Sequence, residues 1–148
     1  CEGCTYTGLA LKMATMHLED RLKVLREHRP RIRYYYPILF LISDGRPECY
    51  DDDVLPEEQR AMREAKAYIK KNVAERHLSV VTVEIGDRCD HDLMRELTGL
   101  SDDKHVVKVS DKFQLASVFR FASSLVSYQS QNSHMDLNSM SVDVNTFQ

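Results

Sequence analysis

With 148 residues, 43% of them hydrophobic, the chain is long enough for one domain with a substantial core, and nothing in it indicates a repeat or a second domain. Its formal net charge of -3 gives no general attraction to nucleic acid or to an acidic membrane surface, so neither is expected as a partner. No apolar segment approaches the roughly 20 residues of a membrane-spanning helix, and no signal-peptide pattern opens the chain. We therefore expect a cytoplasmic protein.

The first predicted element is an amphipathic helix that follows a polar loop, residues 1–7, and ends near residues 26–28. Its apolar side chains recur at steps of three and four residues, at Leu11, Ala14, Leu18, Leu22 and Leu25. The next element is a strand, residues 38–42, in which five consecutive apolar residues are followed by Ser43, Asp44 and Gly45. Such a run is typical of a strand buried on both faces of a parallel sheet. Asp44 would then lie at its carboxyl end.

Two further strands and three helices are predicted after the acidic run Asp51 to Asp53, which we interpret as a solvated loop rather than a second cation site. A helix begins near Pro56, ends near Arg76 and carries the apolar stripe Ala61, Ala65, Ile69 and Val73. A valine-rich strand at 78–85, a short helix at about 90–97 and a short strand at 106–109 follow. Ser110 is the expected N-cap of a last helix, with Leu115, Val118, Phe119, Ala122 and Leu125 on its apolar side.

This order of elements predicts an α/β fold with a parallel sheet flanked by helices over residues 1–128, followed by a flexible tail rich in Ser, Asn and Gln at 129–148. The most apolar strand comes first, so its outer edge is open unless a further strand or another chain pairs with it. The chain also opens on Cys1 rather than Met. We expect a fragment whose sheet lacks its first strands.

Cysteines and histidines give little indication of a site. Cys1 and Cys4 have the spacing of half a zinc site, but Cys49 and Cys89 stand alone, so free thiols are the better interpretation. The histidines have no ligand spacing, and we assign none of them a role. The basic run at 21–33 fits a solvated helix end and loop better than a nucleic-acid surface.

Several motifs resemble von Willebrand factor A domains. The segment Gly3-Cys4-Thr5-Tyr6-Thr7-Gly8 is similar to their Gly-Gly-Thr loop and the start of the following helix, and Leu41-Ile42-Ser43-Asp44-Gly45-Arg46-Pro47 resembles their strand and turn with the pattern (T/S)-D-G-x-P. Residues 83–86 and 119–127 look like the bacterial branch associated with tellurium resistance. The resemblance covers about residues 2–130 and implies the distal half of a Rossmann-like, three-layer fold.

The resemblance also implies a metal-ion-dependent adhesion site for Mg²⁺ or Mn²⁺, with Thr5 and Asp44 at the positions of two ligands. The D-x-S-x-S motif of such sites is absent from this sequence and would precede Cys1. Magnesium prefers oxygen ligands and keeps several waters, so an open position can accept an Asp or Glu from a partner protein. We expect a metal-dependent protein-recognition module, not an enzyme, that holds the ion weakly, and the resemblance implies a link to tellurite or stress resistance.

The competing interpretation is an enzyme or a receiver-like domain in which Asp44 accepts a phosphoryl group. Haloacid-dehalogenase-like hydrolases have D-x-D at this place, whereas the residue two before Asp44 is Ile42. Receiver domains have an acidic pair after an earlier strand, which this chain lacks. No G-x-x-x-x-G-K-(S/T) or G-x-G-x-x-G loop indicates nucleotide binding. The blandest alternative is that Asp44 and Gly45 form an ordinary turn.

Overall fold

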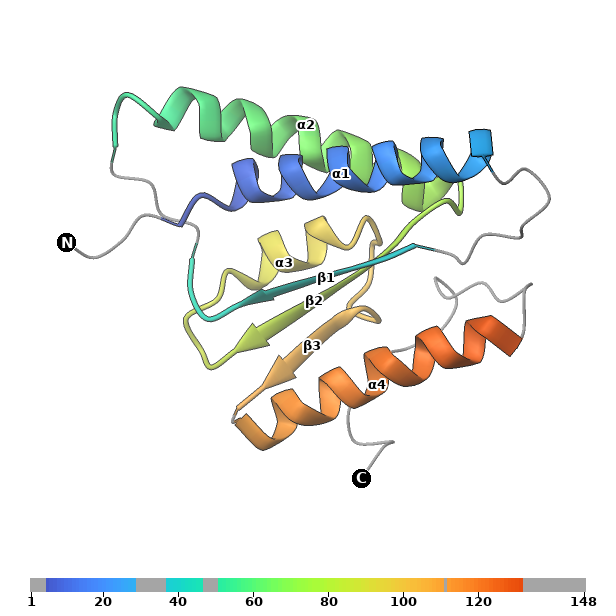
Figure 1. Ribbon diagram of the computed structural model, residues 1–148. Helices are drawn as coiled ribbons and strands as arrows, with labels where there is room; N and C mark the ends of the chain where they lie inside the picture. The colour runs from blue at the N-terminus through green and yellow to red at the C-terminus, as the bar shows by residue number, and fades with distance from the viewer. Residues whose placement is uncertain (1–4, 29–36, 47–50, 111, 132–148) are drawn as a thin grey trace.

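The computed structural model describes residues 5–28, 37–46, 51–110 and 112–131 (Figure 1). Every predicted helix and strand is present, with bounds within a few residues of those expected. The elements are α1 (Thr7–His28), β1 (Ile38–Ser43), α2 (Leu55–Ala74), β2 (Ser79–Ile85), α3 (His91–Leu97), β3 (Val106–Val109) and α4 (Lys112–Gln131). Since α4 continues to Gln131, residues 129–131 are helical rather than part of a tail. Cys1, Cys4, Cys49 and the rest of the predicted tail lie outside the described residues.

The strands in the described part of the chain form one parallel sheet in the order β1-β2-β3 (Figure 1). β1 pairs with β2 from Ile38 opposite Ser79 to Ser43 opposite Glu84. β2 pairs with β3 from Thr82 opposite Val106 to Ile85 opposite Val109. The parallel α/β architecture predicted from the order of elements is confirmed.

The expectation that the first strand is buried on both faces is wrong. β1 lies at an edge of the described sheet, its residues are mostly half-buried, and Ile42 is 37% exposed. The most buried of the described strands is β2, where Val80 and Val83 have no exposed surface and only Ile85 is half-buried. The reason is that β2 has a neighbour on each side, whereas β1 has one among the described strands.

Helices cover both faces of the sheet and make a three-layer arrangement. α1, α2 and α3 lie on one face and α4 lies on the other (Figure 1). The core on the first face contains Leu11, Ala65, Ile69, Val73, Leu78, Val80 and Leu97. The core on the α4 face contains Val81, Val83, Val107, Val109 and Val118. No helix among the described residues is long and apolar enough to cross a membrane.

Two predicted helix faces need correction. On α1, Leu11 and Thr15 are buried while the other predicted apolar residues are half-buried, because α1 packs mainly against α2 rather than on the sheet. On α4, Phe119, which was predicted on the apolar side, is 54% exposed, whereas Phe121 is buried. Ser110 is separated by one residue from Lys112, where α4 begins, and its N–H donates to Oε1 of Gln114 at 2.7 Å.

Candidate functional site

Asp44 lies where the sequence predicts it, at the carboxyl end of β1. Ser43, the last residue of β1, is opposite Glu84, the residue before the last of β2. The two strands therefore end at nearly the same level, and the loops that follow them start side by side. The side chain of Asp44 is exposed and borders a pocket of about 730 Å³ between the loops that follow the two strands. The pocket is lined by Asp44, Gly45, Arg46, Ile85, Gly86, Asp87 and Arg88. Gly86 has φ of 73°, a conformation that favours glycine and turns the chain directly after β2.

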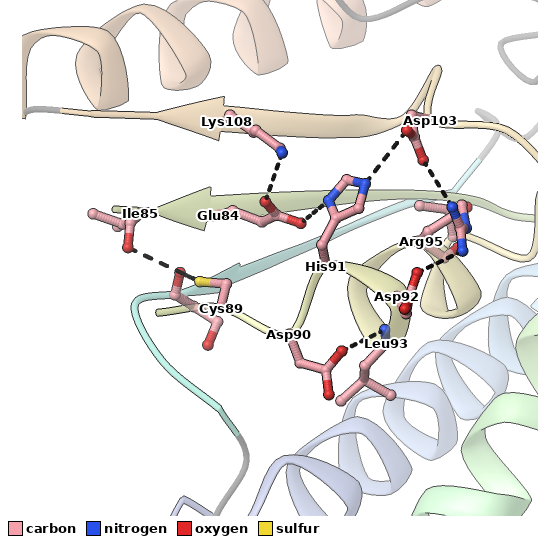
Figure 2. Close-up of polar contacts among 12 residues, drawn as sticks. Glu84, Ile85, Cys89, Asp90, His91, Asp92, Leu93, Arg95, Asp103 and Lys108 are labelled. Atoms are coloured by element: carbon pink, nitrogen blue, oxygen red, sulfur yellow. Dashed lines mark hydrogen bonds and ion pairs between the residues drawn. The ribbon is translucent and has the colours of Figure 1, made fainter. Parts of the chain in front are cut away.

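Cys89 holds the loop after β2 against the end of β1. Its thiol donates a hydrogen bond to the Ser43 carbonyl oxygen at 3.1 Å and makes a longer contact of 3.9 Å with the Ile85 carbonyl oxygen (Figure 2). Burial is the largest influence on this thiol and raises its pKa; a hydrogen bond with the Ile85 backbone lowers the pKa by less, and the negative charges of Glu84 and Asp44 raise it by still smaller amounts. Cys89 is therefore a protonated donor that fixes the pocket wall rather than an activated nucleophile.

The pocket carries two acidic and two basic side chains that do not pair with one another. Asp44, Arg46, Asp87 and Arg88 are all exposed. None of the four forms an ion pair with another residue in the described part of the chain. The formal charge of this lining is zero, and all four groups can interact with a ligand.

Thr5, the second predicted metal ligand, lies near the same end of the fold. It precedes α1, whose first turn contacts the first turn of α2, and α2 follows the loop that leaves β1 (Figure 1). Thr5 is exposed but does not line the pocket that contains Asp44. The structure thus places both predicted ligands at one end of the fold without joining them into a site.

The donor set fits a magnesium ion in part. No group of three or more His, Cys, Asp or Glu side chains among the described residues is arranged to hold a metal ion. Asp44 and Thr5 would supply two oxygen ligands, whereas magnesium takes six, and Arg46 and Arg88 add positive charge to the pocket. The described residues alone do not form a complete cation site.

A second polar cluster, which the sequence analysis missed, surrounds Glu84 on the central strand (Figure 2). Glu84 is 4% exposed, and its Oε1 lies 2.7 Å from Nδ1 of His91, near the start of α3. Its Oε2 lies 4.0 Å from Nζ of Lys108, the residue opposite it on β3. The other ring nitrogen of His91, Nε2, lies 3.3 Å from Oδ2 of Asp103.

The His91 ring therefore connects β2 to the loop before β3. Glu84 and Asp103 bind its two nitrogens on opposite sides, so the three groups cannot converge on one ion. We interpret the cluster as the means by which a buried carboxylate is satisfied beside the pocket. The sequence carries one signal of the cluster, because Glu84 is the single charged residue of the valine-rich strand β2.

Comparison of the chain with protein-family models, curated proteins and solved structures gives no match. The fold is α/β with a parallel sheet, and the resemblance to von Willebrand factor A domains stays a prediction from the motifs.

Proposed function

We propose that the chain is a protein-recognition module of the von Willebrand factor A type, in which the carboxyl edge of the sheet binds an acidic group of a partner protein with the help of Mg²⁺ or Mn²⁺. The observation that carries the proposal is the exposed Asp44 carboxylate at the end of β1, in a pocket between two strand-end loops. Ligands of open α/β sheets bind outside the carboxyl ends of the strands.

In this proposal Asp44 contributes a carboxylate and Thr5 a hydroxyl to the cation, and the remaining ligands come from outside the described residues. A divalent cation that keeps an open coordination position supplies positive charge for the partner's carboxylate. Two protein ligands make the affinity for the ion low. The module acts in the cytoplasm, has no catalytic step, and is linked to tellurite or stress resistance by the resemblance alone.

Thermal unfolding with and without millimolar Mn²⁺ tests the role of Asp44. At a Mn²⁺ concentration ten times its dissociation constant, binding raises the free energy of unfolding by about 1.4 kcal/mol. For a domain of this size, that raises the midpoint of thermal unfolding by about 4 °C. We expect this rise for the wild type and for Asp52→Ala, an exposed acidic control outside the pocket, but not for Asp44→Ala. A midpoint that ignores Mn²⁺, or rises equally without Asp44, contradicts the proposal.

Phosphoryl transfer to Asp44 stays the alternative. Incubation with acetyl phosphate followed by mass spectrometry of the peptide that contains Asp44 separates the two functions. A phosphorylated Asp44 would favour the enzyme or receiver interpretation, whereas the recognition module predicts no modification at this residue.

A further inference from the structure

We propose that Arg46 and Arg88 form an arginine pair across the pocket that binds the partner's carboxylate directly. The inference rests on the proposed function, because it takes the carboxyl edge of the sheet as the surface that receives an acidic group. It goes beyond that function by assigning recognition to two guanidinium groups of this chain, so that part of the binding needs no cation.

The geometry places the two arginines on two different loops that line one pocket. Arg46 follows β1 and Arg88 follows β2, and both line the same cavity of about 730 Å³. The two loops leave neighbouring strands, which lie roughly 5 Å apart in a sheet. The hydrogen bond from Cys89 to the Ser43 carbonyl oxygen, at 3.1 Å, fixes the loop after β2 against the end of β1. The pocket walls are therefore tied to the sheet on both sides.

Arg46 and Arg88 differ from several other cations of the described chain in having no carboxylate partner there. Elsewhere in the described chain, cations such as Lys12, Lys66 and Arg95 have carboxylate partners within 3 Å. Arg46 and Arg88 have none among the described residues, although two aspartates share their pocket. Within the described part of the chain, no carboxylate therefore competes with a ligand for their N–H groups.

The chemistry of the lining indicates a carboxylate as the ligand. A guanidinium group donates two parallel hydrogen bonds that match the two oxygens of a carboxylate. Asp44 and Asp87 balance the charge of the arginines, so the pocket has no excess positive charge to hold a more highly charged anion without a cation. A singly charged Asp or Glu side chain of a partner protein fits this balance better than a phosphate.

Peptide binding to the whole chain tests the arginine pair. The probe is a fluorescent Gly/Ser-rich peptide with one aspartate, titrated in EDTA and in millimolar Mn²⁺, beside the same peptide with asparagine. We expect Arg46→Ala and Arg88→Ala each to weaken binding about tenfold in both conditions, because each removes charge-assisted hydrogen bonds. Arg63→Ala, an exposed arginine on α2 outside the pocket, should bind as the wild type does. Asp44→Ala should lose the gain that Mn²⁺ provides, while its binding in EDTA should not weaken, because this variant keeps both arginines and removes one negative charge from the pocket.

The outcomes separate the inference from the function on which it rests. If the aspartate peptide binds and both arginine variants bind it as tightly as the wild type, the arginine pair is wrong while the recognition function stands. If no aspartate peptide binds in either condition, both proposals fail. If a phosphoserine peptide binds more tightly than the aspartate peptide in EDTA, the carboxylate assignment is overturned. Unfolding midpoints of the variants should equal that of the wild type, since both side chains are exposed.

Discussion

The Glu58 carboxylate of α2 lies at the N-terminus of α1 and accepts a hydrogen bond from the backbone N–H of Gly8, and its second oxygen accepts one from the N–H of Leu9 at 2.9 Å. α1 has no acidic residue in its own first turn. A carboxylate from the neighbouring helix therefore satisfies two of the unpaired N–H groups of that turn and offsets the positive end of the helix dipole. This contact joins the first turns of α1 and α2.

Replacing Gly8 by Ala should separate the two helices. A Cβ atom at this position would lie 2.6 Å from the Glu58 carbonyl oxygen and 2.7 Å from the Met62 backbone nitrogen, and backbone atoms cannot rotate away. We expect Gly8→Ala to lower the free energy of unfolding by about 2 kcal/mol in urea denaturation. Gly45→Ala is the matched control, because a Cβ there has no neighbour within 4 Å. Equal stability of the two variants would contradict the close contact.

Changing Glu58 tests the hydrogen bonds separately from the packing. Glu58 is 6% exposed, so Glu58→Ala leaves the N–H groups of Gly8 and Leu9 without their acceptor in a mostly buried place. We expect a loss of about 2–3 kcal/mol for Glu58→Ala and about 1 kcal/mol for Glu58→Gln, which keeps one acceptor oxygen. Glu57→Ala, at an exposed neighbouring position, should change stability by less than about 0.5 kcal/mol. A Gln variant as unstable as the Ala variant would mean that the charge, not the acceptor, is decisive.

The fold could be predicted from the sequence because helical and strand patterns are local. Apolar periodicity located the helices, and the run at Ile38 to Ile42 located both a strand and the place of Asp44 at its carboxyl end. The exposure of β1 could not be predicted in the same way, since it depends on how many strands flank it. The exposure of Phe119 and the burial of Phe121 similarly depend on how α4 is rotated on the sheet.

The polar contacts at the site could not be predicted, because their partners are distant in sequence. Glu58 and Gly8 are separated by 50 positions, so no local pattern indicates their contact. The pairing of Glu84 with Lys108 follows from the register of β2 and β3, and this register cannot be predicted from the sequence of either strand alone. Arg46 and Arg88 are far apart in the sequence, and only the register of β1 and β2 brings their loops to one pocket.

Replacing His91 by Ala measures how much its contact with the buried Glu84 carboxylate stabilises the fold. In His91→Ala the carboxylate keeps Nζ of Lys108 at 4.0 Å but loses its partner at 2.7 Å. We expect a loss of about 2 kcal/mol in the free energy of unfolding, because a buried charge is left poorly satisfied. Asp103→Ala removes the exposed side of the same network and should cost less than about 1 kcal/mol.

A double-mutant cycle with Glu84→Gln measures the coupling between His91 and Glu84. The two losses should not add, since the amide leaves no buried charge for the imidazole to satisfy. Additive losses, or equal effects of the His91 and Asp103 variants, would show that the contact between His91 and Glu84 carries no special weight.

The thiol of Cys89 should make stability depend on alkaline pH. Its pKa is raised in the folded chain by burial and by the charges of Glu84 and Asp44, whereas the unfolded thiol titrates near its ordinary value of about 8.5. Because the pKa is raised on folding, the thiol's contribution to the free energy of unfolding is fully present below the pKa of the unfolded chain. This contribution is lost as the pH rises through the pKa of the folded chain. The free energy of unfolding of the wild type should therefore fall relative to Cys89→Ser above about pH 8.5.

Urea titrations at a series of pH values measure this difference in the free energy of unfolding, in which the ionisations shared by both proteins cancel. Below that pH the difference should be constant, and iodoacetamide should modify Cys89 more slowly in the folded chain than in urea. A flat difference across the alkaline range, together with equal alkylation rates, would show that the thiol does not hold the loop after β2 against Ser43.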